Sequence, residues 1–458
     1  MTQYLIEAAY LAASILFVLG LKSLTRPDSA RRGMQQAAVG MLLAIVGTLL
    51  NHQIVRYDWI LGGLVVGTVI GIPLGFMVPM TAMPQRIAIS HMFGALAATL
   101  VGIVEYREAA GHIDSVRMGA LGFEVLFGAL TVTGSFMAFG KLQELVPGRP
   151  VTYPGQNAVN IALFAATLGM LVYIVLHPLA ATVFYVMIAL AFVIGISMVL
   201  PIGGADMPVV ISLLNSYAGL ASSATGFAIG NNVLIIAGAL DGASGLLLSV
   251  LMSKAMNRSF GNVLFGAFGS PVASSARTTE GLAVRSISAE DAALQLAYAK
   301  LVIVVPGYGM AVAQAQHQVR ELAHLIERHG GTVKYAIHPV AGRMPGHMNV
   351  LLAEADVPYD RLYDMEEIND EFERADVALV IGANDVVNPA ARSDRGSPIY
   401  GMPILNVDKA HSIIVLKRSM NPGFAGIENE LFYDPKTSML FGDAKASLTR
   451  LVAEVKNL

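Results

Sequence analysis

The sequence predicts an α-helical, polytopic membrane domain of about nine spanning helices, followed by an α/β domain built on a parallel sheet. Residues 1 to about 255 hold long apolar runs with few charges, whereas residues 285 to 458 have the mixed composition of a globular domain. The chain is 55% hydrophobic and only 14% charged, which is too apolar for a wholly soluble protein. In the second half, strand patterns alternate with helix patterns, as is typical of a parallel sheet.

These patterns divide the 458 residues into a transmembrane domain (1–258), a glycine- and serine-rich linker (259–287) and a C-terminal domain (288–458). The absence of cysteine excludes disulfides, cysteine-ligated metals and thiol catalysis, and we expect no metal site. A formal net charge of −3 gives no reason to expect a nucleic-acid partner. The N-terminus lacks a basic leader region, so we expect the first apolar run to stay in the mature protein.

Nine apolar runs each have about 20 residues, the length that crosses a hydrocarbon core of about 30 Å. They lie near 4–22, 34–51, 59–78, 85–104, 118–139, 157–176, 179–200, 206–228 and 233–254. An odd number of spans puts the termini on opposite sides. Lysine and arginine are more numerous in the connections on one side, so the positive-inside rule places the C-terminal domain in the cytoplasm and the N-terminus outside. In the third span, Gly63, Gly67, Gly71 and Gly75 form a predicted helix-packing face.

Two ionisable side chains lie inside predicted spans. His91 lies in the fourth span, and Glu124 in the fifth heads a polar face that continues through Gly128, Thr131 and Ser135. An ionisable group is costly in hydrocarbon and marks a functional site by default. An imidazole also exchanges protons near neutral pH. These two residues are therefore candidates for proton movement.

The eighth span carries a second polar face. Its members are Ser212, Asn215, Ser216, Gly219 and Ser223, with Asp206 at the cytoplasmic end. Hydrogen bonds between helices explain the serines and threonines, at about 0.6 kcal/mol each. They explain His91 and Glu124 poorly, because neutral residues would pack as well. We therefore predict a water-lined proton path with His91 as the titrating residue and Asn215 as its candidate partner.

The C-terminal domain opens with a strand-turn-helix pattern. The apolar stretch 301–305 predicts a buried parallel strand, Gly307-Tyr308-Gly309 a tight turn, and residues from Met310 a helix. This pattern is a dinucleotide fingerprint, in which Gly309 lets the backbone approach a phosphorylated ligand. An ordinary strand-to-helix turn also fits, because Val312 stands where Gly or Ala is usual. Further strands at 332–337, 377–381, 403–407 and 412–416 predict a doubly wound, Rossmann-type sheet.

The residues after the second strand bear on cofactor choice. An acid there would bind the ribose 2′-hydroxyl of NAD, but the strand ends in Ile337-His338-Pro339, with Arg343 beyond. The segment Lys417-Arg418-Ser419 follows the last predicted strand and adds basic groups, although such a pair is also common on solvated surfaces. The sequence thus favours NADP(H) over NAD(H).

Six longer motifs point to one family. In the C-terminal domain they are 306–316, 338–351, 382–385 and 417–421, and in the membrane half they are 203–208 and 254–260. Together they resemble the β subunit of proton-translocating nicotinamide nucleotide transhydrogenase, over essentially the whole chain. The resemblance implies hydride transfer from NADH to NADP⁺ coupled to inward proton movement across a bacterial inner membrane, with the chain in contact with membrane lipid. NAD(H) would bind a partner α subunit, because this chain has one fingerprint, so we expect no transhydrogenation by this subunit alone. A homodimer of the complex is expected from the resemblance only.

The resemblance also implies roles for single residues of the C-terminal domain. Lys417, Arg418 and Ser419 would hold the 2′-phosphate. The cofactor would be lined by Gly307, Tyr308, Gly309, Met310, Ala311, Val312 and Arg343. In the motif Gly382-Ala383-Asn384-Asp385, Gly382 and Asn384 would also face the cofactor, and Asp385 would lie near its nicotinamide side. Gly423 and Ala425 would belong to a lid (423–426) over the bound nucleotide.

In the membrane half, His91 and Asn215 match the family's proton-path positions. Asp206 and Arg258 lie where the membrane and nucleotide domains are thought to communicate.

A rival function has the same architecture: an ion channel or secondary transporter regulated by a cytoplasmic, nucleotide-sensing Rossmann domain. The spans contain no filter sequence of the Thr-Val-Gly-Tyr-Gly kind and no pair of broken helices in matching halves. These observations favour the transhydrogenase.

Overall fold

The computed structural model describes residues 2–50, 57–79, 82–109, 113–147, 151–203, 206–255, 260–261, 284–343, 346–395, 397, 399–423 and 426–458. The chain divides into two compact units, Met1–Val250 (unit 1) and Leu251–Leu458 (unit 2). Most of the predicted linker (259–287) lies outside the described residues. Its end does not, and the backbone of Arg285 and Ile287 bonds to Met439 of unit 2.

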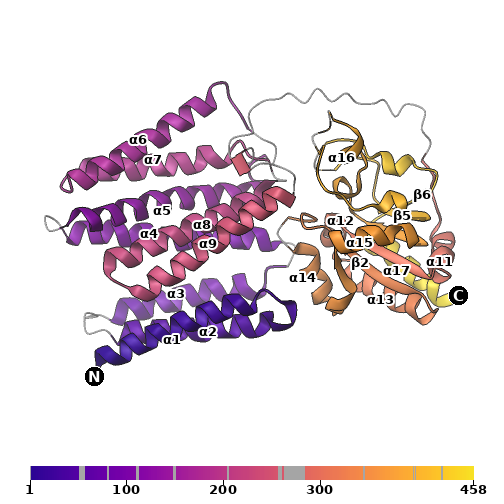
Figure 1. The fold of residues 1–458 in the computed structure, drawn as a ribbon, viewed down its shortest axis with the longest axis horizontal. Helices are drawn as coiled ribbons and strands as arrows, with labels where there is room; N and C mark the ends of the chain where they lie inside the picture. The colour runs from indigo at the N-terminus through magenta and orange to yellow at the C-terminus, as the bar shows by residue number, and fades with distance from the viewer. Residues whose placement is uncertain are drawn as a thin grey trace. The chain divides into compact units, whose positions relative to one another are not determined.

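Nine long helices are described in the first 255 residues, and each coincides with a predicted span (Figure 1). They are α1 (Thr2–Ser23), α2 (Pro27–Leu49), α3 (Tyr57–Phe76), α4 (Met83–Glu108), α5 (Ser115–Leu142), α6 (Gln156–Leu176), α7 (Ala181–Val199), α8 (Met207–Ile229) and α9 (Asn232–Ala255). Eight of the helices found in the described residues are long and apolar enough to cross a membrane. Helix α2 is not among them, since its first turns hold Arg31, Arg32, Gln35 and Gln36.

Helix α5 lies at the centre of unit 1 and packs against α4, α7 and α8. Its buried Leu130 joins Val199 and Met207 in one apolar cluster, and Val125 joins Phe184 in another. At the other extreme, no residue of α3 is buried. The four glycines of the predicted packing face do not pack against another helix: among the described residues, no atom lies within 4 Å of a Cβ placed at any of them. The Gly75 carbonyl accepts a hydrogen bond from the Arg86 side chain at 2.9 Å.

Unit 2 is built on a six-stranded parallel sheet with the order β3-β2-β1-β4-β5-β6. The strands are β1 (Leu301–Pro306), β2 (Thr332–Ile337), β3 (Leu362–Asp364), β4 (Val377–Ile381), β5 (Ser412–Lys417) and β6 (Thr437–Phe441). The predicted parallel Rossmann-type sheet is confirmed. The predicted strand at 403–407 is wrong, because Leu405 N bonds Val386 O and Asn406 N bonds the Asn369 side chain instead of a strand. Strands β3 and β6 were not predicted.

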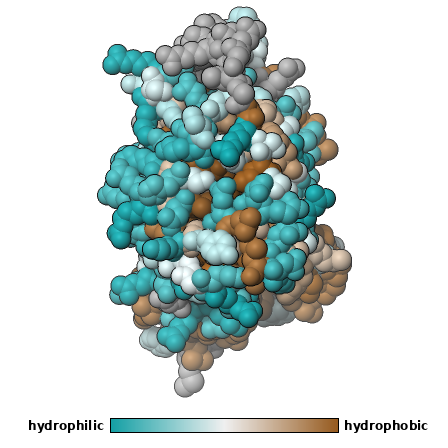
Figure 2. Space-filling model, turned by 90° about the vertical axis from the view of Figure 1, so that its right-hand side faces the viewer, coloured by the Kyte–Doolittle hydropathy of each residue, from teal (hydrophilic) through white to brown (hydrophobic). Residues whose placement is uncertain are grey.

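Helices cover both faces of the sheet (Figure 1). They include α11 (Ala289–Ala297), α12 (Tyr308–Ala313), α13 (Gln316–Arg328), α14 (His347–Glu354), α15 (Met365–Ile368), α16 (Ala390–Ser393) and α17 (Ala444–Asn457), with short 3-10 turns η3 (Tyr359–Arg361), η4 (Asn369–Arg374), η5 (Asp385–Val387), η6 (Val407–Lys409) and η7 (Glu430–Tyr433). The helix predicted from Met310 is interrupted, because Gln314 takes a left-handed φ of 49° between α12 and α13. The face of unit 2 in Figure 2 is mostly hydrophilic, with apolar residues confined to narrow areas.

Alternating strand residues form the core of unit 2. Ile303, Val380 and Val415 pack on one face of the sheet against Phe372 of η4 and Phe432 of η7. All five are at most 2% exposed, so this layer is dry and closely packed.

We therefore expect Phe372→Ala to lower the free energy of unfolding of unit 2 by about 3–5 kcal/mol, because it removes a fully buried ring and leaves a cavity. Tyr298→Ala is the matched control, since Tyr298 is 80% exposed, and should change it by less than about 0.5 kcal/mol. Hydrogen exchange of the β1 and β4 amides, measured by mass spectrometry on the full chain in detergent, reports both values. Equal protection in the two variants would contradict this account of the core.

Candidate functional site

The predicted cofactor residues follow strands at one edge of the sheet. Because the strands are parallel, the segments after β1, β2, β4 and β5 leave from the same edge, where ligands of α/β sheets gather. These segments begin at Gly307, His338, Gly382 and Arg418. The structure thus brings together residues that are more than 100 positions apart in the sequence.

The turns after β1 and β4 touch each other backbone to backbone. Gly307 N donates to Ile381 O and Gly309 N to Gly382 O, both at 2.9 Å. A Cβ at Gly307 would overlap Ala383, and a Cβ at Gly309 would come within 2.7 Å of Gly382 Cα. Gly382 has a left-handed φ of 64° and also contacts Gly309. The glycines of the fingerprint are therefore required by this contact between turns, in addition to any approach to a ligand.

Of the remaining fingerprint residues, Met310 and Ala311 are buried beneath the turn, and Val312 is exposed. Tyr308 lies half-buried at the surface, and the Arg343 guanidinium stacks 4.6 Å from the centre of its ring. His347 lies behind them, fully buried, and its Nδ1 accepts from Arg343 N at 3.0 Å. Burial, aided by the Arg343 charge, lowers the pKa of His347 to about 4, so the ring is neutral.

The motif after β4 is held by the segment before η7. Asn429, which is 2% exposed, donates to Asn384 O at 3.0 Å and to Asn384 Oδ1 at 3.2 Å. Asn388 is fully buried and donates to Glu428 O at 3.0 Å. Gly423 packs directly on this motif, since a Cβ there would lie 2.6 Å from Asn384 Nδ2 and 2.7 Å from Asp385 Oδ1. The predicted lid thus begins in contact with Asn384, predicted to face the cofactor, and with Asp385, predicted to lie near its nicotinamide side. Ala425 lies outside the described residues.

Three polar residues follow β5. The Lys417 ammonium lies 5.0 Å over the Phe432 ring and donates to Asn421 O. Burial lowers the pKa of Lys417, and the nearby Asp385 charge opposes that shift. Arg418 and Ser419 are exposed. Lys417, the last residue of β5, and Asp385, the first residue of η5, are therefore close enough to interact.

This edge of the sheet fits an anionic dinucleotide. Arg343, Lys417 and Arg418 supply positive charge that matches phosphate groups. Among the described residues, Asn384 Nδ2 and His347 Nε2 are buried polar atoms with no hydrogen-bond partner. Buried polar groups normally have partners, so both atoms are consistent with a bound ligand or water at this place.

Residues 6–454 match the protein family described as NAD(P) transhydrogenase beta subunit. The chain belongs to this family.

The NAD(P) transhydrogenase subunit beta of Rhodospirillum rubrum is 51% identical over 473 aligned positions, covering 99% of this chain and 99% of the relative. A second sequence, from a named strain of the same species, gives the same values. As a transhydrogenase beta subunit whose described residues include eight helices apolar enough to span a bilayer, the chain is a membrane protein.

In the membrane unit, α4 and α5 pack through the predicted polar face of α5. Gly128 touches Ala95 and Thr99 of α4, and Gly102 of α4 touches Glu124, whose carboxyl is fully buried. This antiparallel register, extended by about two turns, brings His91 level with Ser135. His91 Nδ1, Ser135 Oγ and both Glu124 oxygens are buried without a hydrogen-bond partner among the described residues.

Helix α8 packs against this region, and its Asn215 side chain contacts α9. Leu214 touches Gly134, the neighbour of Ser135, so α8 reaches the same level of the bundle. Asn215 Nδ2 donates to Asp241 Oδ1 of α9 at 3.0 Å. Asp241 was not among the predicted residues, although a lone acid in the ninth apolar run is a visible signal. Asp206 is the buried N-cap residue of α8, and Arg258 lies outside the described residues.

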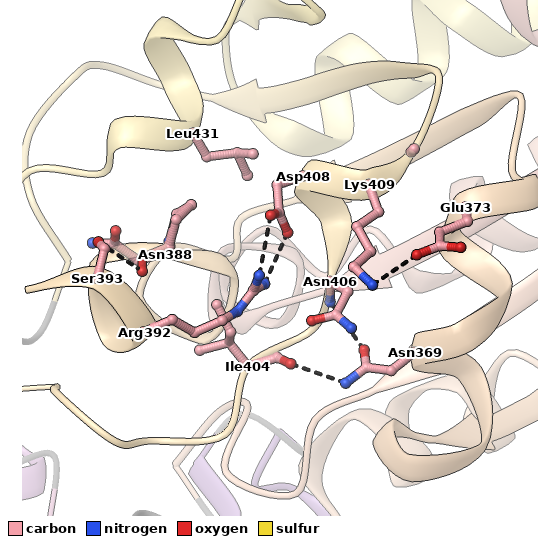
Figure 3. Close-up of polar contacts among 12 residues, drawn as sticks. Asn369, Glu373, Asn388, Arg392, Ser393, Ile404, Asn406, Asp408, Lys409 and Leu431 are labelled. Atoms are coloured by element: carbon pink, nitrogen blue, oxygen red, sulfur yellow. Dashed lines mark hydrogen bonds and ion pairs between the residues drawn. The ribbon is translucent and has the colours of Figure 1, made fainter.

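A cavity of about 430 Å³, which the sequence does not predict, lies beside α16 in unit 2. Its lining includes Asn369, Arg392, Tyr400, Met402 and Asn406. Figure 3 shows that several of these side chains bond to neighbours: Arg392 pairs with Asp408 at 2.8 Å, and Asn369 bridges Ile404 O and Asn406 N. These contacts fix the extended segment that the sequence predicted as a strand.

His338 connects that segment to the end of β2. It is 1% exposed, its Nε2 bonds Pro403 O at 2.8 Å, and its Nδ1 accepts from Val340 N at 3.2 Å. These partners assign a neutral ring with the proton on Nε2. Burial lowers the pKa of His338 to about 4, against the raising effect of the Pro403 hydrogen bond.

Because the folded state binds this proton more weakly than the unfolded state, unit 2 should lose stability as the pH falls from about 6.5 to about 4, by on the order of 3 kcal/mol for His338. His338→Gln cannot titrate and should remove that part of the pH dependence. The exposed His317→Gln is the matched control and should keep it. Urea unfolding of the detergent-solubilised chain, followed by circular dichroism across this pH range, measures the slope; equal slopes in the two variants would count against a neutral His338.

Proposed function

We propose that this chain is the NADP(H)-binding, proton-translocating subunit of a transhydrogenase that transfers hydride from NADH to NADP⁺. The observation that carries the proposal is the edge of the sheet where the glycine turn, Arg343, Asp385 and Lys417 converge in a member of the beta-subunit family. The alternative, a nucleotide-regulated channel or transporter, has no such support.

Within this site, Lys417, Arg418 and Ser419 would hold the 2′-phosphate at the end of β5. The fingerprint turn and Arg343 would line the diphosphate, with Arg343 oriented by its stacking on Tyr308. Asn384 and Asp385 would lie at the nicotinamide side, fixed by Asn429. Bound NADP⁺ would accept the hydride at its nicotinamide ring, and the protein's task is to position that ring and limit its access to water. Gly423, packed on Asn384 and Asp385, would begin the lid that does so.

The NADH would be held by a partner α subunit. The chain contains one dinucleotide fingerprint, and its relatives are named as beta subunits, which implies a complementary subunit. Alone, this subunit would bind NADP(H) without transferring hydride. A homodimer of the whole complex also belongs to this proposal.

Inward proton movement would supply the driving force. NADH and NADPH carry the same reactive ring, so hydride exchange between them releases little free energy. One proton that crosses a membrane potential of about 100 mV releases about 2.3 kcal/mol. This free energy changes the equilibrium ratio of products to reactants by more than tenfold. We place the chain in a bacterial inner membrane, with the N-terminus outside and unit 2 in the cytoplasm, as the distribution of Lys and Arg favours. This orientation includes α2 as the ninth crossing helix, because an odd number of crossings puts the termini on opposite sides.

The 2′-phosphate assignment predicts selective loss of NADPH affinity. Lys417→Gln should weaken NADPH binding by about 1.5–3 kcal/mol, the worth of a charged hydrogen bond, and leave the much weaker NADH binding unchanged. Lys409→Gln removes a lysine that pairs with Glu373 beyond the other end of β5 and is the matched control. Calorimetric titration of each full-length variant with NADPH and with NADH makes the comparison. Equal affinity of the wild type for both nucleotides would refute an NADP(H) site.

The proton-path assignment predicts that His91→Ala abolishes proton movement in the complex with its partner subunit. His91 is the only histidine within the described part of α4, so no other imidazole on that helix can replace it. Ser90→Ala, at the adjacent position, is the control. Proton uptake by proteoliposomes during NADPH formation is the measurement, and wild-type uptake in His91→Ala would remove His91 from the path.

A further inference from the structure

Helices α8 and α9 pack more closely than side chains larger than glycine or serine allow. A Cβ at Gly219 would overlap Gly242, and a Cβ at Gly226 would lie 2.6 Å from Ile235 N. Close approach of this kind is how helices associate in lipid, where small residues at the interface let backbones touch. The two antiparallel helices therefore form one rigid seam.

The serines of this seam bond to backbone. Ser212 Oγ donates to Gly245 O at 2.9 Å, Ser216 Oγ to Gly242 O at 2.7 Å and Ser223 Oγ to Ile235 O at 3.2 Å. Each hydroxyl proton is thus committed to a carbonyl of α9. The serines of the polar face hold the helices together, and they are not free to pass protons in this arrangement.

Asn215 differs from these serines because it bonds to an ionisable side chain. Its Nδ2 donates to Asp241 Oδ1 at 3.0 Å. An amide cannot exchange protons by titration near neutral pH, whereas a carboxyl can. At this position the chemistry of proton binding therefore belongs to Asp241, and Asn215 orients it.

The depth and exposure of Asp241 support a functional role. It is the tenth residue of α9, about 14 Å from the helix start and so near the middle of a hydrocarbon core of about 30 Å. Asp241 is exposed on the surface of this chain. A carboxyl facing lipid at that depth is costly, so this face of α9 borders water or another polypeptide in the assembled protein.

Other titratable groups around the seam are few. Helix α8 carries Tyr217, which packs on Phe127 of α5 and lies on a different face from Asn215. Among the described residues, the other ionisable side chain of α9 is Lys254, in its last turn. Behind α8, helices α4 and α5 carry His91 and Glu124. Asp241 is thus the acid nearest to Asn215.

We propose that Asp241 is a proton-binding residue of the membrane unit, held in place by Asn215. On uptake, a proton from water forms an O–H bond at the carboxylate, at Oδ2 while Oδ1 accepts from Asn215; on release, that bond breaks and the proton returns to water. No electrons change place. The proposal rests on the proton translocation proposed above and adds a second titrating group to His91.

The test uses the complex of the full chain with its partner subunit in proteoliposomes. Asp241→Asn keeps the size and a hydrogen-bonding group but cannot titrate, and should lower coupled proton uptake by about 100-fold or more. Asp241→Glu restores the carboxyl and should recover most of the rate. Ser244→Ala removes a hydroxyl that bonds Asp241 O one turn away, and as the matched control should retain wild-type uptake.

The second measurement is the infrared C=O band of a protonated carboxyl. A residue with a structural role alone would give no band that depends on pH. A pH-dependent band should be present in the wild type and in Ser244→Ala, and absent in Asp241→Asn. If the wild type moves protons and Asp241→Asn does so at the same rate, or keeps the band, the role of Asp241 is refuted while the proposed function stands. If the wild type moves no protons, the proposed function fails, and this inference fails with it.

Discussion

The candidate nucleotide site depends on one contact, in which the turns after β1 and β4 meet backbone to backbone. The N–H groups of Gly307 and Gly309 bond to carbonyls of the other segment, and no side chain fits between the two turns. This contact brings Tyr308 and Arg343 on one side into a fixed relation with Asn384 and Asp385 on the other. In the proposed dinucleotide site, the same pair of turns would therefore position both the phosphate-binding end and the nicotinamide end, and a small shift in either turn would displace both.

Close backbone contact also organises the membrane unit, where it holds helices together. In lipid, apolar side chains gain nothing by leaving the solvent, so close backbone packing and hydrogen bonds hold helices together. Along the α8–α9 seam the serine hydroxyls meet this need. Buried polar atoms of His91, Glu124 and Ser135 have no such partner among the described residues, and Asp241 is an ionisable group that helix packing does not require. Polar groups that only bond helix to helix therefore belong to ordinary helix association, and the remaining polar groups are the candidates for the proton path.

Much of this organisation is visible in the sequence. Apolar run length predicts the nine long helices described before residue 256, and eight of them are apolar enough to cross a bilayer. Runs of β-branched residues predict the central strands. The errors have local causes. Pro403–Val407 is as apolar as a strand, yet its backbone groups bond to Val386 and Asn369. Short edge strands such as β3 give little signal. Asp241 was passed over because its partner, Asn215, lies 26 positions away, and only the register of two helices brings them together.

The seam between α8 and α9 also limits which substitutions this sequence can accept during evolution. Positions such as Gly219 and Gly226 cannot accept even a methyl group without separating the helices, so we expect selection to act against substitutions there whatever their effect on proton binding. The outward face of α9, with Leu247 and Leu251, has no such restriction. A residue invariant along the seam is thus weak evidence of a chemical role, whereas an acid kept at an exposed position beside the seam, as Asp241 is, is stronger evidence of one.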